Sequence, residues 1–88
     1  MDTLETRELR YFLAVAEELH FGRAAKRLGM AQPPLTRAIQ QLERRLGVAL
    51  LQRNRRGVAL TDSGEMLLHE GRAALDATTA AARRTRPI

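Results

Sequence analysis

The sequence predicts a mainly α-helical domain with a two-stranded β hairpin near its middle and a long helix at its C-terminal end. Apolar residues recur at helical spacing along most of the chain, whereas one central segment has two short apolar runs separated by turn residues. Apolar residues make up 44% of the 88 residues, which is enough for one small core. Aromatic residues amount to 3%, so this core must be mainly aliphatic.

Two helices are expected in the N-terminal third. The first should run from roughly Thr6 to Leu19, and the second, shorter helix from Arg23 to Leu28, with Gly22 as its N-cap and Gly29 in a left-handed turn after it. The first helix is predicted by one stripe of apolar residues: Leu9, Phe12, Leu13, Ala16 and Leu19.

The third expected helix begins at the stretch "QPPLTR", residues 32–37. The first N–H groups of a helix have no partner within it, so proline costs little there, and its φ angle already suits a helix. The residue before a proline favours an extended conformation, which places Gln32 outside the helix. Gly47 should end the helix. Its apolar face is formed by Leu35, Ile39, Leu42 and Leu46, and its polar face by Thr36, Arg37, Gln40, Gln41, Arg44 and Arg45.

The segment "VALLQRNRRGVALT" then changes from helical to strand spacing. Asn54 and Gly57 supply turn chemistry between its two apolar runs, so we expect a short β hairpin with a basic tip. Thr61 is a good N-cap for a helix that should continue almost to Pro87. The predicted arrangement is a winged helix-turn-helix domain over residues 1–61, in which three helices carry a two-stranded wing, followed by a linker and dimerisation helix over residues 62–88.

Positive charge is concentrated in the middle of the chain. Residues 21–56 hold nine Lys or Arg and only Glu43 as an acid, a net charge of +8, while residues 1–20 carry −3 and residues 57–88 carry 0. Such a basic segment in an ordered domain favours a polyanionic partner, although a solvated basic surface is the alternative. We interpret the acidic beginning of the first helix as solvated surface.

The start of the third helix contains the residue types that read DNA bases. In a helix-turn-helix domain the N-terminal residues of the second helix of the motif enter the major groove. Arginine can donate two hydrogen bonds to guanine, glutamine can pair with adenine, and threonine and proline can contact the methyl group of thymine. A proline-started amphipathic helix is common without any such role, but its place in this motif favours DNA binding. The candidate base-reading residues are Gln32, Pro33, Pro34, Thr36 and Arg37.

From about Glu8 to Ala74 the sequence resembles the DNA-binding domain of the LysR-type transcriptional regulators. The segments "FLAVAEE", "AAKRL", "QPPLTRAIQQLERRLG" and "LLQRNRRGVALT" carry the resemblance, together with the glycine of "TDSG". One departure is Gly22, where the family usually has Ser or Thr. The resemblance implies base contacts from the five residues named above and an approach of Arg53, Arg55 and Arg56 to the DNA backbone and the minor groove, which attracts arginine where it is narrow.

The resemblance also implies a linker helix that pairs with its counterpart in a second chain. A stripe on the last helix has nothing left in the chain to cover it, which favours the same interpretation. We expect Met66 and either Leu67 or Leu68 to turn inward. A homodimer is expected, or a tetramer in a full-length protein. The stripe comprises Leu68, Gly71, Leu75, Thr78 and Ala82, of which the first four are the candidate dimerisation residues.

Family members normally continue into a domain that senses a small-molecule inducer. We therefore expect this chain to be the DNA-binding part of a longer cytoplasmic regulator, with a natural stand-alone protein as the alternative. No cofactor, metal site or membrane segment is expected, because the chain has no cysteine, two distant histidines and no long apolar run. An enzyme is disfavoured, because Ser63, Asp62 and His69 lack an oxyanion glycine motif. A protein-docking module and a non-specific DNA-binding protein remain as alternatives.

Overall fold

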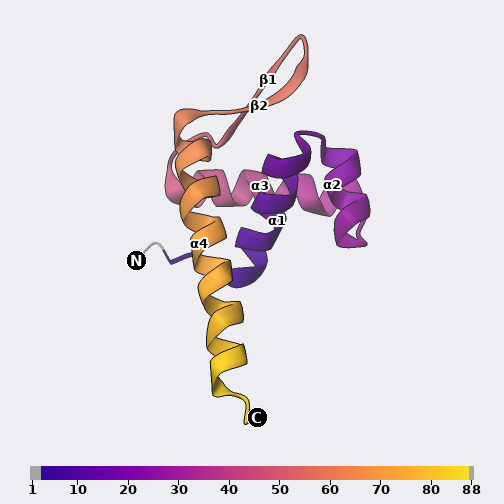
Figure 1. Ribbon diagram of the computed structural model, residues 1–88. Helices are drawn as coiled ribbons and strands as arrows, with labels where there is room; N and C mark the ends of the chain where they lie inside the picture. Colours follow the sequence, from indigo (N-terminus) through magenta and orange to yellow (C-terminus); the bar gives the residue numbers. More distant parts are fainter. Residues whose placement is uncertain (1–2, 88) are drawn as a thin grey trace.

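A computed structural model describes residues 3–87 and contains four helices and one β hairpin (Figure 1). This order confirms the predicted fold class of three helices, a two-stranded wing and a long last helix. Met1, Asp2 and Ile88, which belong to the two predicted regions, lie outside the described residues. The elements are α1 (Thr6–Glu18), α2 (Phe21–Leu28), α3 (Gln32–Leu46), β1 (Leu51–Asn54), β2 (Gly57–Leu60) and α4 (Asp62–Thr85).

Helix α1 is the centre of the core and contacts α2, α3 and α4. Phe12 and Val15 on α1 are completely buried, and Leu35 and Leu42 reach them from α3 as the predicted apolar face requires. Each such side chain stabilises the fold by roughly 1.5–3 kcal/mol when it leaves water. The hairpin projects from one end of this core and the C-terminal half of α4 from the other, which gives a longest dimension of 51 Å (Figure 1).

Helix α2 begins two residues earlier than expected. Leu19 follows α1 in a left-handed conformation with φ 50°, and α2 begins at Phe21. The N-cap is His20, whose Nδ1 accepts a hydrogen bond from the Arg23 N–H at 2.9 Å. The prediction that Gly22 caps a helix from Arg23 is therefore wrong. Histidine is not among the common capping residues, so the sequence pattern did not indicate this imidazole cap.

Helix α3 begins one residue earlier than expected. Ala31 is its extended N-cap and Gln32 its first helical residue, so the prediction that Gln32 lies outside the helix is wrong. Pro33 and Pro34 then occupy the second and third helical positions, where a backbone N–H has no partner within the helix in any case. Gly47 ends the helix with φ 72°, as predicted.

The hairpin is antiparallel, and its register pairs Leu51 with Leu60 and Asn54 with Gly57. Asn54 Oδ1 accepts a hydrogen bond from the Arg56 N–H at 2.8 Å, which stabilises the tight turn. Thr61 caps α4 as predicted, because its Oγ1 accepts from the Gly64 N–H at 3.0 Å. In the part of the chain that the structure describes, no helix is both long and apolar enough to cross a membrane.

Helix α4 packs its N-terminal half along α1. Gly71 is buried there, and a Cβ atom added to it would lie 2.8 Å from Leu9 Cδ1. Leu67 and Leu68 are half-buried against the core, in agreement with the expectation, but Met66 is 61% exposed. The prediction that Met66 turns inward is wrong, because the inward face of α4 is set by the close approach of Gly71 to α1.

Candidate nucleic-acid interface

The N-terminal turns of α3 present the five candidate base-reading residues together. Gln32, Pro33, Pro34 and Arg37 are exposed, and Thr36 is half-buried. Among residues 3–87, no hydrogen bond or ion pair engages the Arg37 guanidinium, so its donors are available to a ligand. The structure thus brings these side chains to one exposed helix end, which is what contact with base edges in a groove requires.

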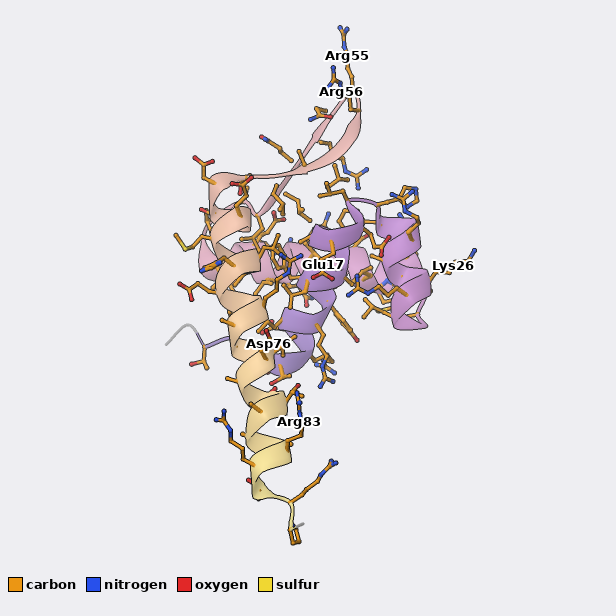
Figure 2. All side chains as sticks on the ribbon, in the orientation of Figure 1. Glu17, Lys26, Arg55, Arg56, Asp76 and Arg83 are labelled. Atoms are coloured by element: carbon orange, nitrogen blue, oxygen red, sulfur yellow. The ribbon has the colours of Figure 1, made fainter. Side chains whose placement is uncertain are left out.

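The three arginines of the wing are placed in two different ways. Figure 2 shows Arg55 and Arg56 at the tip of the hairpin. Arg53 lies nearer the helices, with its guanidinium carbon 5.5 Å from the centre of the Phe21 ring at the start of α2. This is a cation–π distance, so the position of Arg53 is tied to α2 while the other two arginines extend into solvent.

A hollow of about 460 Å³ lies between the wing, the start of α2 and the start of α3. The charged residues that line it are all arginines: Arg23, Arg53 and Arg56. Gln32 also lines this hollow, so one candidate base-reading residue and two wing arginines border the same positively charged space. Opposite charge on a ligand such as a phosphate backbone is attracted to such a concave basic surface.

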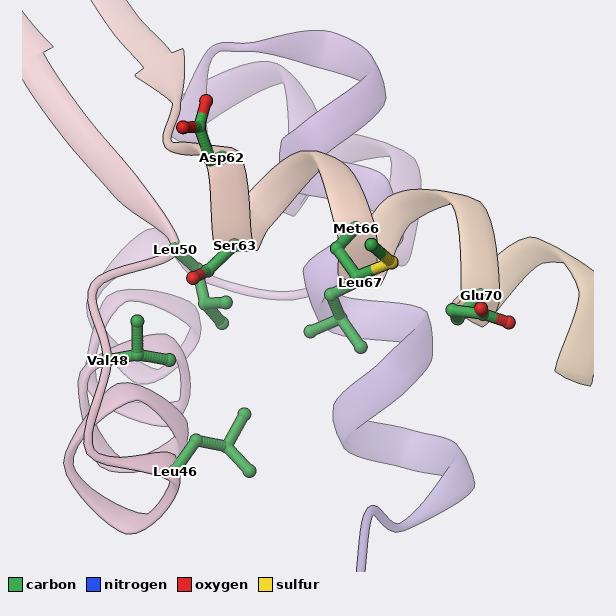
Figure 3. A pocket seen from close by; sticks show the side chains of 8 residues that line it. All are labelled: Leu46, Val48, Leu50, Asp62, Ser63, Met66, Leu67 and Glu70. Atoms are coloured by element: carbon green, nitrogen blue, oxygen red, sulfur yellow. The ribbon is translucent and has the colours of Figure 1, made fainter.

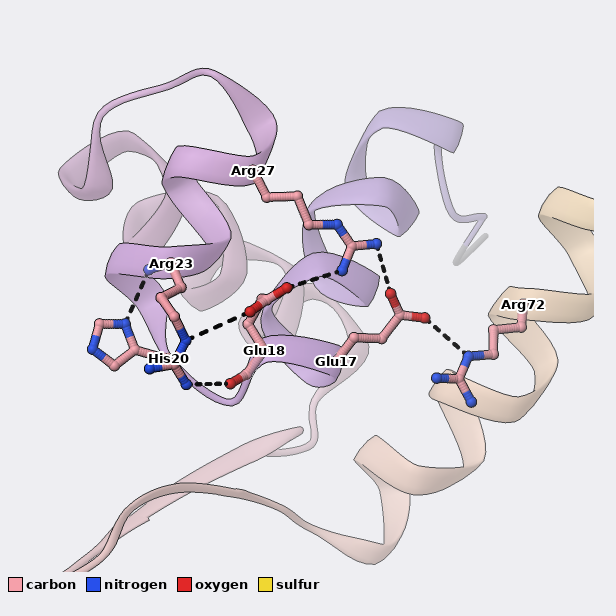
Figure 4. Close-up of polar contacts among 6 residues, drawn as sticks. All are labelled: Glu17, Glu18, His20, Arg23, Arg27 and Arg72. Atoms are coloured by element: carbon pink, nitrogen blue, oxygen red, sulfur yellow. Dashed lines mark hydrogen bonds and ion pairs between the residues drawn. The ribbon is translucent and has the colours of Figure 1, made fainter.

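Several arginines of the basic segment have their charge partly offset, because they pair with carboxylates of α1. Arg27 Nη2 lies 2.6 Å from Glu17 Oε1, and Arg23 Nε lies 3.5 Å from Glu18 Oε1 (Figure 4). Arg72 of α4 donates to the second oxygen of Glu17 at 3.0 Å, so Glu17 links α1 to both α2 and α4. The interpretation of the acidic beginning of α1 as solvated surface is wrong for Glu8, whose carboxylate pairs with Arg45. The complementary net charges of the two segments were the sequence signal for these pairs.

The pKa values of two α1 carboxyls reflect these contacts. The hydrogen bond from Arg27 holds the pKa of Glu17 below its ordinary value, although partial burial opposes the shift. On the opposite side of α1, Arg45 Nη2 donates to Glu8 Oε1 at 2.6 Å and lowers the pKa of Glu8 in the same way. Both carboxyls stay ionised at neutral pH, so they neutralise arginines that lie away from the start of α3.

The four candidate dimerisation residues do not share one environment. Leu68, Gly71 and Leu75 pack towards α1, so the premise that nothing in the chain covers this stripe is wrong. Thr78 is exposed, and its hydroxyl donates to the backbone oxygen of Leu75 at 2.8 Å.

A separate apolar groove lies beside α4, between the end of α3 and the segment that leads to β1 (Figure 3). Val48, 39% exposed, lies on one side of the groove and Met66 on the other, with Asp62 and Glu70 at its edge. A large exposed apolar surface of this kind often marks a protein interface. Within the described residues, no group of three or more His, Asp or Glu side chains is placed to hold a metal ion.

These features define a winged helix-turn-helix domain with an exposed, basic recognition surface. Residues 6–65 match the family model described as "Bacterial regulatory helix-turn-helix protein, lysR family". Because this match covers well over half of the chain, the protein belongs to the LysR family of bacterial transcriptional regulators, and its fold is that of the family's DNA-binding domain. LysR regulators are a family of transcription factors rather than enzymes.

Individual relatives agree with this assignment. The chain is 58% identical over 72 residues to the HTH-type transcriptional regulator AlsR of Bacillus subtilis, which covers 82% of this chain and 24% of AlsR. It is similar to the structure of the CbnR_DBD–DNA complex, with a TM-score of 0.87, 46% identity and coverage of 94% of this chain and 95% of that chain. It is also similar to the BenM_DBD/catB site 1 DNA complex, with a TM-score of 0.89, 43% identity and coverage of 93% of this chain and 92% of that chain. The chain spans about a quarter of the length of the curated relatives it matches first.

Proposed function

We propose that this chain binds operator DNA sequence-specifically as a homodimer and that it does so in the bacterial cytoplasm. Helix α3 inserts its N-terminal turns into the major groove, and the wing approaches the backbone and the minor groove. The observation that carries this proposal is the cluster of mostly exposed residues at the start of α3, where Arg37 has no partner among residues 3–87, beside a hollow lined by wing arginines. The similar CbnR and BenM domain structures, which are complexes with DNA, support it.

Each base-reading residue has a chemical role in this proposal. Arg37 donates two hydrogen bonds to the O6 and N7 atoms of a guanine, and the Gln32 amide pairs with an adenine. Thr36 and the rings of Pro33 and Pro34 contact thymine methyl groups. Phosphates are bound by the wing arginines Arg53, Arg55 and Arg56, and by the N–H groups at helix starts, which fix the orientation without reading sequence.

The homodimer is proposed to form through α4, on the face that the chain itself leaves open. Since Leu68, Gly71 and Leu75 pack on α1, the second copy would contact mainly the opposite face, where Met66 and Ala77 are exposed, with Thr78 at its margin. Asp62 lies in the first turn of α4, one turn before Met66, and the last turn contains Arg83 and Arg84. Two copies of α4 packed antiparallel would therefore place opposite charges beside each other.

A dimer with two-fold symmetry would read an interrupted inverted repeat, because each α3 contacts one half-site. A tetramer and a small-molecule inducer enter the proposal only for a longer protein with a C-terminal sensing domain. Two other functions make different predictions. A protein-docking module would not depend on Arg37 or Arg53, and a non-specific DNA-binding protein would lose affinity with salt equally for every sequence.

Selection of bound duplexes from a random DNA pool at near-physiological salt tests this function. The expected result is an enriched inverted repeat whose half-sites lie about one helical turn apart, or a multiple of it. A pool that is retained at low salt but shows no enriched sequence would identify a non-specific binder. A pool that is not retained at all would favour the docking module.

A further inference from the structure

Glu43 is the single carboxylate of the basic segment 21–56, and it lies at the junction of α3 and the wing. It is half-buried on α3, and its Oε2 atom accepts hydrogen bonds from the Leu50 N–H at 2.7 Å and the Leu51 N–H at 3.2 Å. These two donors stand where the chain enters β1. Hydrogen bonds to an ionised acceptor are roughly twice as strong as neutral ones, so the carboxylate forms a firm link between α3 and the first strand.

The same short segment is also fixed to α4. The Thr61 N–H donates to the Leu50 oxygen at 3.0 Å, and the Thr61 hydroxyl donates to the Ala49 oxygen at 2.6 Å. The base of the wing is thus held from α3 by a side-chain carboxylate and from α4 by a capping threonine. Beyond this base Arg53 contacts the Phe21 ring of α2, and Arg55 and Arg56 at the tip are exposed.

We propose that Glu43 is a positioning residue for DNA binding: its carboxylate holds the wing at a fixed place relative to α3, so that the wing arginines reach the DNA backbone while Arg37 occupies the groove. The inference rests on the function proposed above. Glu43 itself contacts no DNA, because its carboxylate is directed to backbone donors of its own chain. Its effect on binding therefore passes entirely through the wing.

Electrostatics alone predicts the opposite effect of removing this charge. Glu43 lies in a segment of net charge +8, and a negative charge near bound DNA repels phosphates. Glu43→Ala would therefore bind DNA more tightly if charge were all that mattered. The positioning role instead predicts weaker binding, because a wing freed from its anchor must be ordered when it binds. The sign of the change separates the two explanations.

The experiment measures Kd for the selected operator with the wild type and three variants. We expect Glu43→Ala to bind about five- to tenfold more weakly, the size of one lost charged hydrogen-bond link. Glu43→Gln retains an oxygen acceptor at the same place and should recover most of this loss. Glu65→Ala is the matched control, since it removes one exposed carboxylate from α4 without touching the wing, and it should bind as tightly as the wild type or slightly more tightly.

A double-mutant cycle with Arg55→Ala shows whether the effect passes through the wing. In the wild type, Arg55→Ala should weaken binding several-fold and flatten its dependence on salt. In the Glu43→Ala background it should add less than about a twofold loss, because the wing arginine no longer reaches its phosphate productively. Equal effects of Arg55→Ala in both backgrounds, or binding by Glu43→Ala as tight as by Glu65→Ala, would overturn the inference.

Amide hydrogen exchange of the free proteins gives a readout that needs no DNA. The amides of Leu50, Leu51 and the hairpin should exchange faster in Glu43→Ala, to an intermediate extent in Glu43→Gln, and as in the wild type in Glu65→Ala, while the buried α1 amides stay protected in all of them. Unchanged hairpin exchange in Glu43→Ala refutes the anchor itself. If the wild type prefers no DNA sequence and Arg55→Ala leaves its DNA binding unchanged, the proposed function is refuted instead, even where hydrogen exchange shows that the anchor exists.

Discussion

The two buried glycines of α4 allow a sharp test of how this helix is placed. A Cβ atom at Gly64 would lie 2.1 Å from the backbone oxygen of Leu50, far inside the 3.0 Å that real Cβ contacts respect. The oxygen is part of the main chain and already accepts the Thr61 N–H, so it cannot rotate away as a side chain would. Gly64→Ala must therefore separate the start of α4 from the base of the wing by about 0.9 Å.

The expected cost follows from three contributions. Overpacking of this kind costs typically about 1–3 kcal/mol, here near the upper end because the obstacle is backbone. Weakening the Thr61 hydrogen bond adds about 1 kcal/mol, and the better helix propensity of alanine returns at most about 1 kcal/mol. Gly64→Ala should thus lower the free energy of unfolding by about 2–3 kcal/mol, which for a domain of this size lowers Tm by roughly 10–20 °C.

Gly71→Ala is the matched control on the same helix. Its Cβ atom would meet Leu9 Cδ1 at 2.8 Å and Leu13 Cδ2 at 3.4 Å, and both are ends of side chains that can shift. The small packing cost and the gain in helix propensity nearly cancel, so the free energy of unfolding should stay within about 1 kcal/mol of the wild type. Thermal and urea unfolding followed by circular dichroism at equal protein concentrations measures both variants. A Gly64→Ala protein as stable as Gly71→Ala would refute the close approach of α4 to the wing.

Three further predictions concern the recognition surface, the ion pairs and the dimer. Arg37→Ala should lose about 1–3 kcal/mol of binding free energy at the preferred operator and relax the choice of one base. Affinities for operators with single-base changes measure both effects. An unchanged base preference would contradict direct readout. Glu17→Gln should reduce stability at neutral pH by about 1 kcal/mol or less, since its partners are partly exposed. Arg27 lowers the pKa of Glu17, so the stability that this pairing contributes is complete above the ordinary pKa of 4.5 and is lost as the pH falls through the lowered pKa. The free energies of unfolding of the wild type and Glu17→Gln, measured by urea titration, should therefore converge in acid. A difference that stays constant with pH would contradict the pairing. Ala77→Glu should shift the protein towards monomer in sedimentation, whereas Thr79→Glu, on another face of α4, should not.

The order of the elements and the exposed end of α3 could be predicted because each depends on local sequence. Helical spacing at Leu35, Ile39 and Leu42 indicates the buried face directly, and what remains on α3 must face solvent. The capping role of Thr61 likewise follows from residue type. His20 could not be assigned in this way, because an imidazole caps a helix only when its ring folds back over the helix start, and at Gly22 a Cβ atom would lie 2.9 Å from that ring.

Sequence patterns did not predict the contacts between elements that are far apart in the sequence. The last helix has more than one apolar stripe, and periodicity does not say which of them meets α1. Gly71 contained a usable signal, since a glycine within a long helix often marks a close approach of another element. The partner of Glu43 could not be foreseen either, because its acceptor oxygen meets backbone N–H groups, which every residue carries.

The ion pairs of α1 bear on the sequence-specific binding proposed above, because they limit how many cations are free to attract phosphates. Were all nine basic residues of the segment 21–56 free, phosphate attraction would dominate binding, and affinity would depend little on base sequence. Glu8, Glu17 and Glu18 instead pair with Arg45, Arg27 and Arg23, so the charges of three of these nine cations are partly offset within the described residues. The carboxylates of α1 thereby confine the unpaired positive charge largely to α3 and the wing. Under the proposed function, a surface restricted in this way would gain affinity mainly when the start of α3 sits correctly in a groove, so that base contacts, rather than charge alone, would decide where it binds.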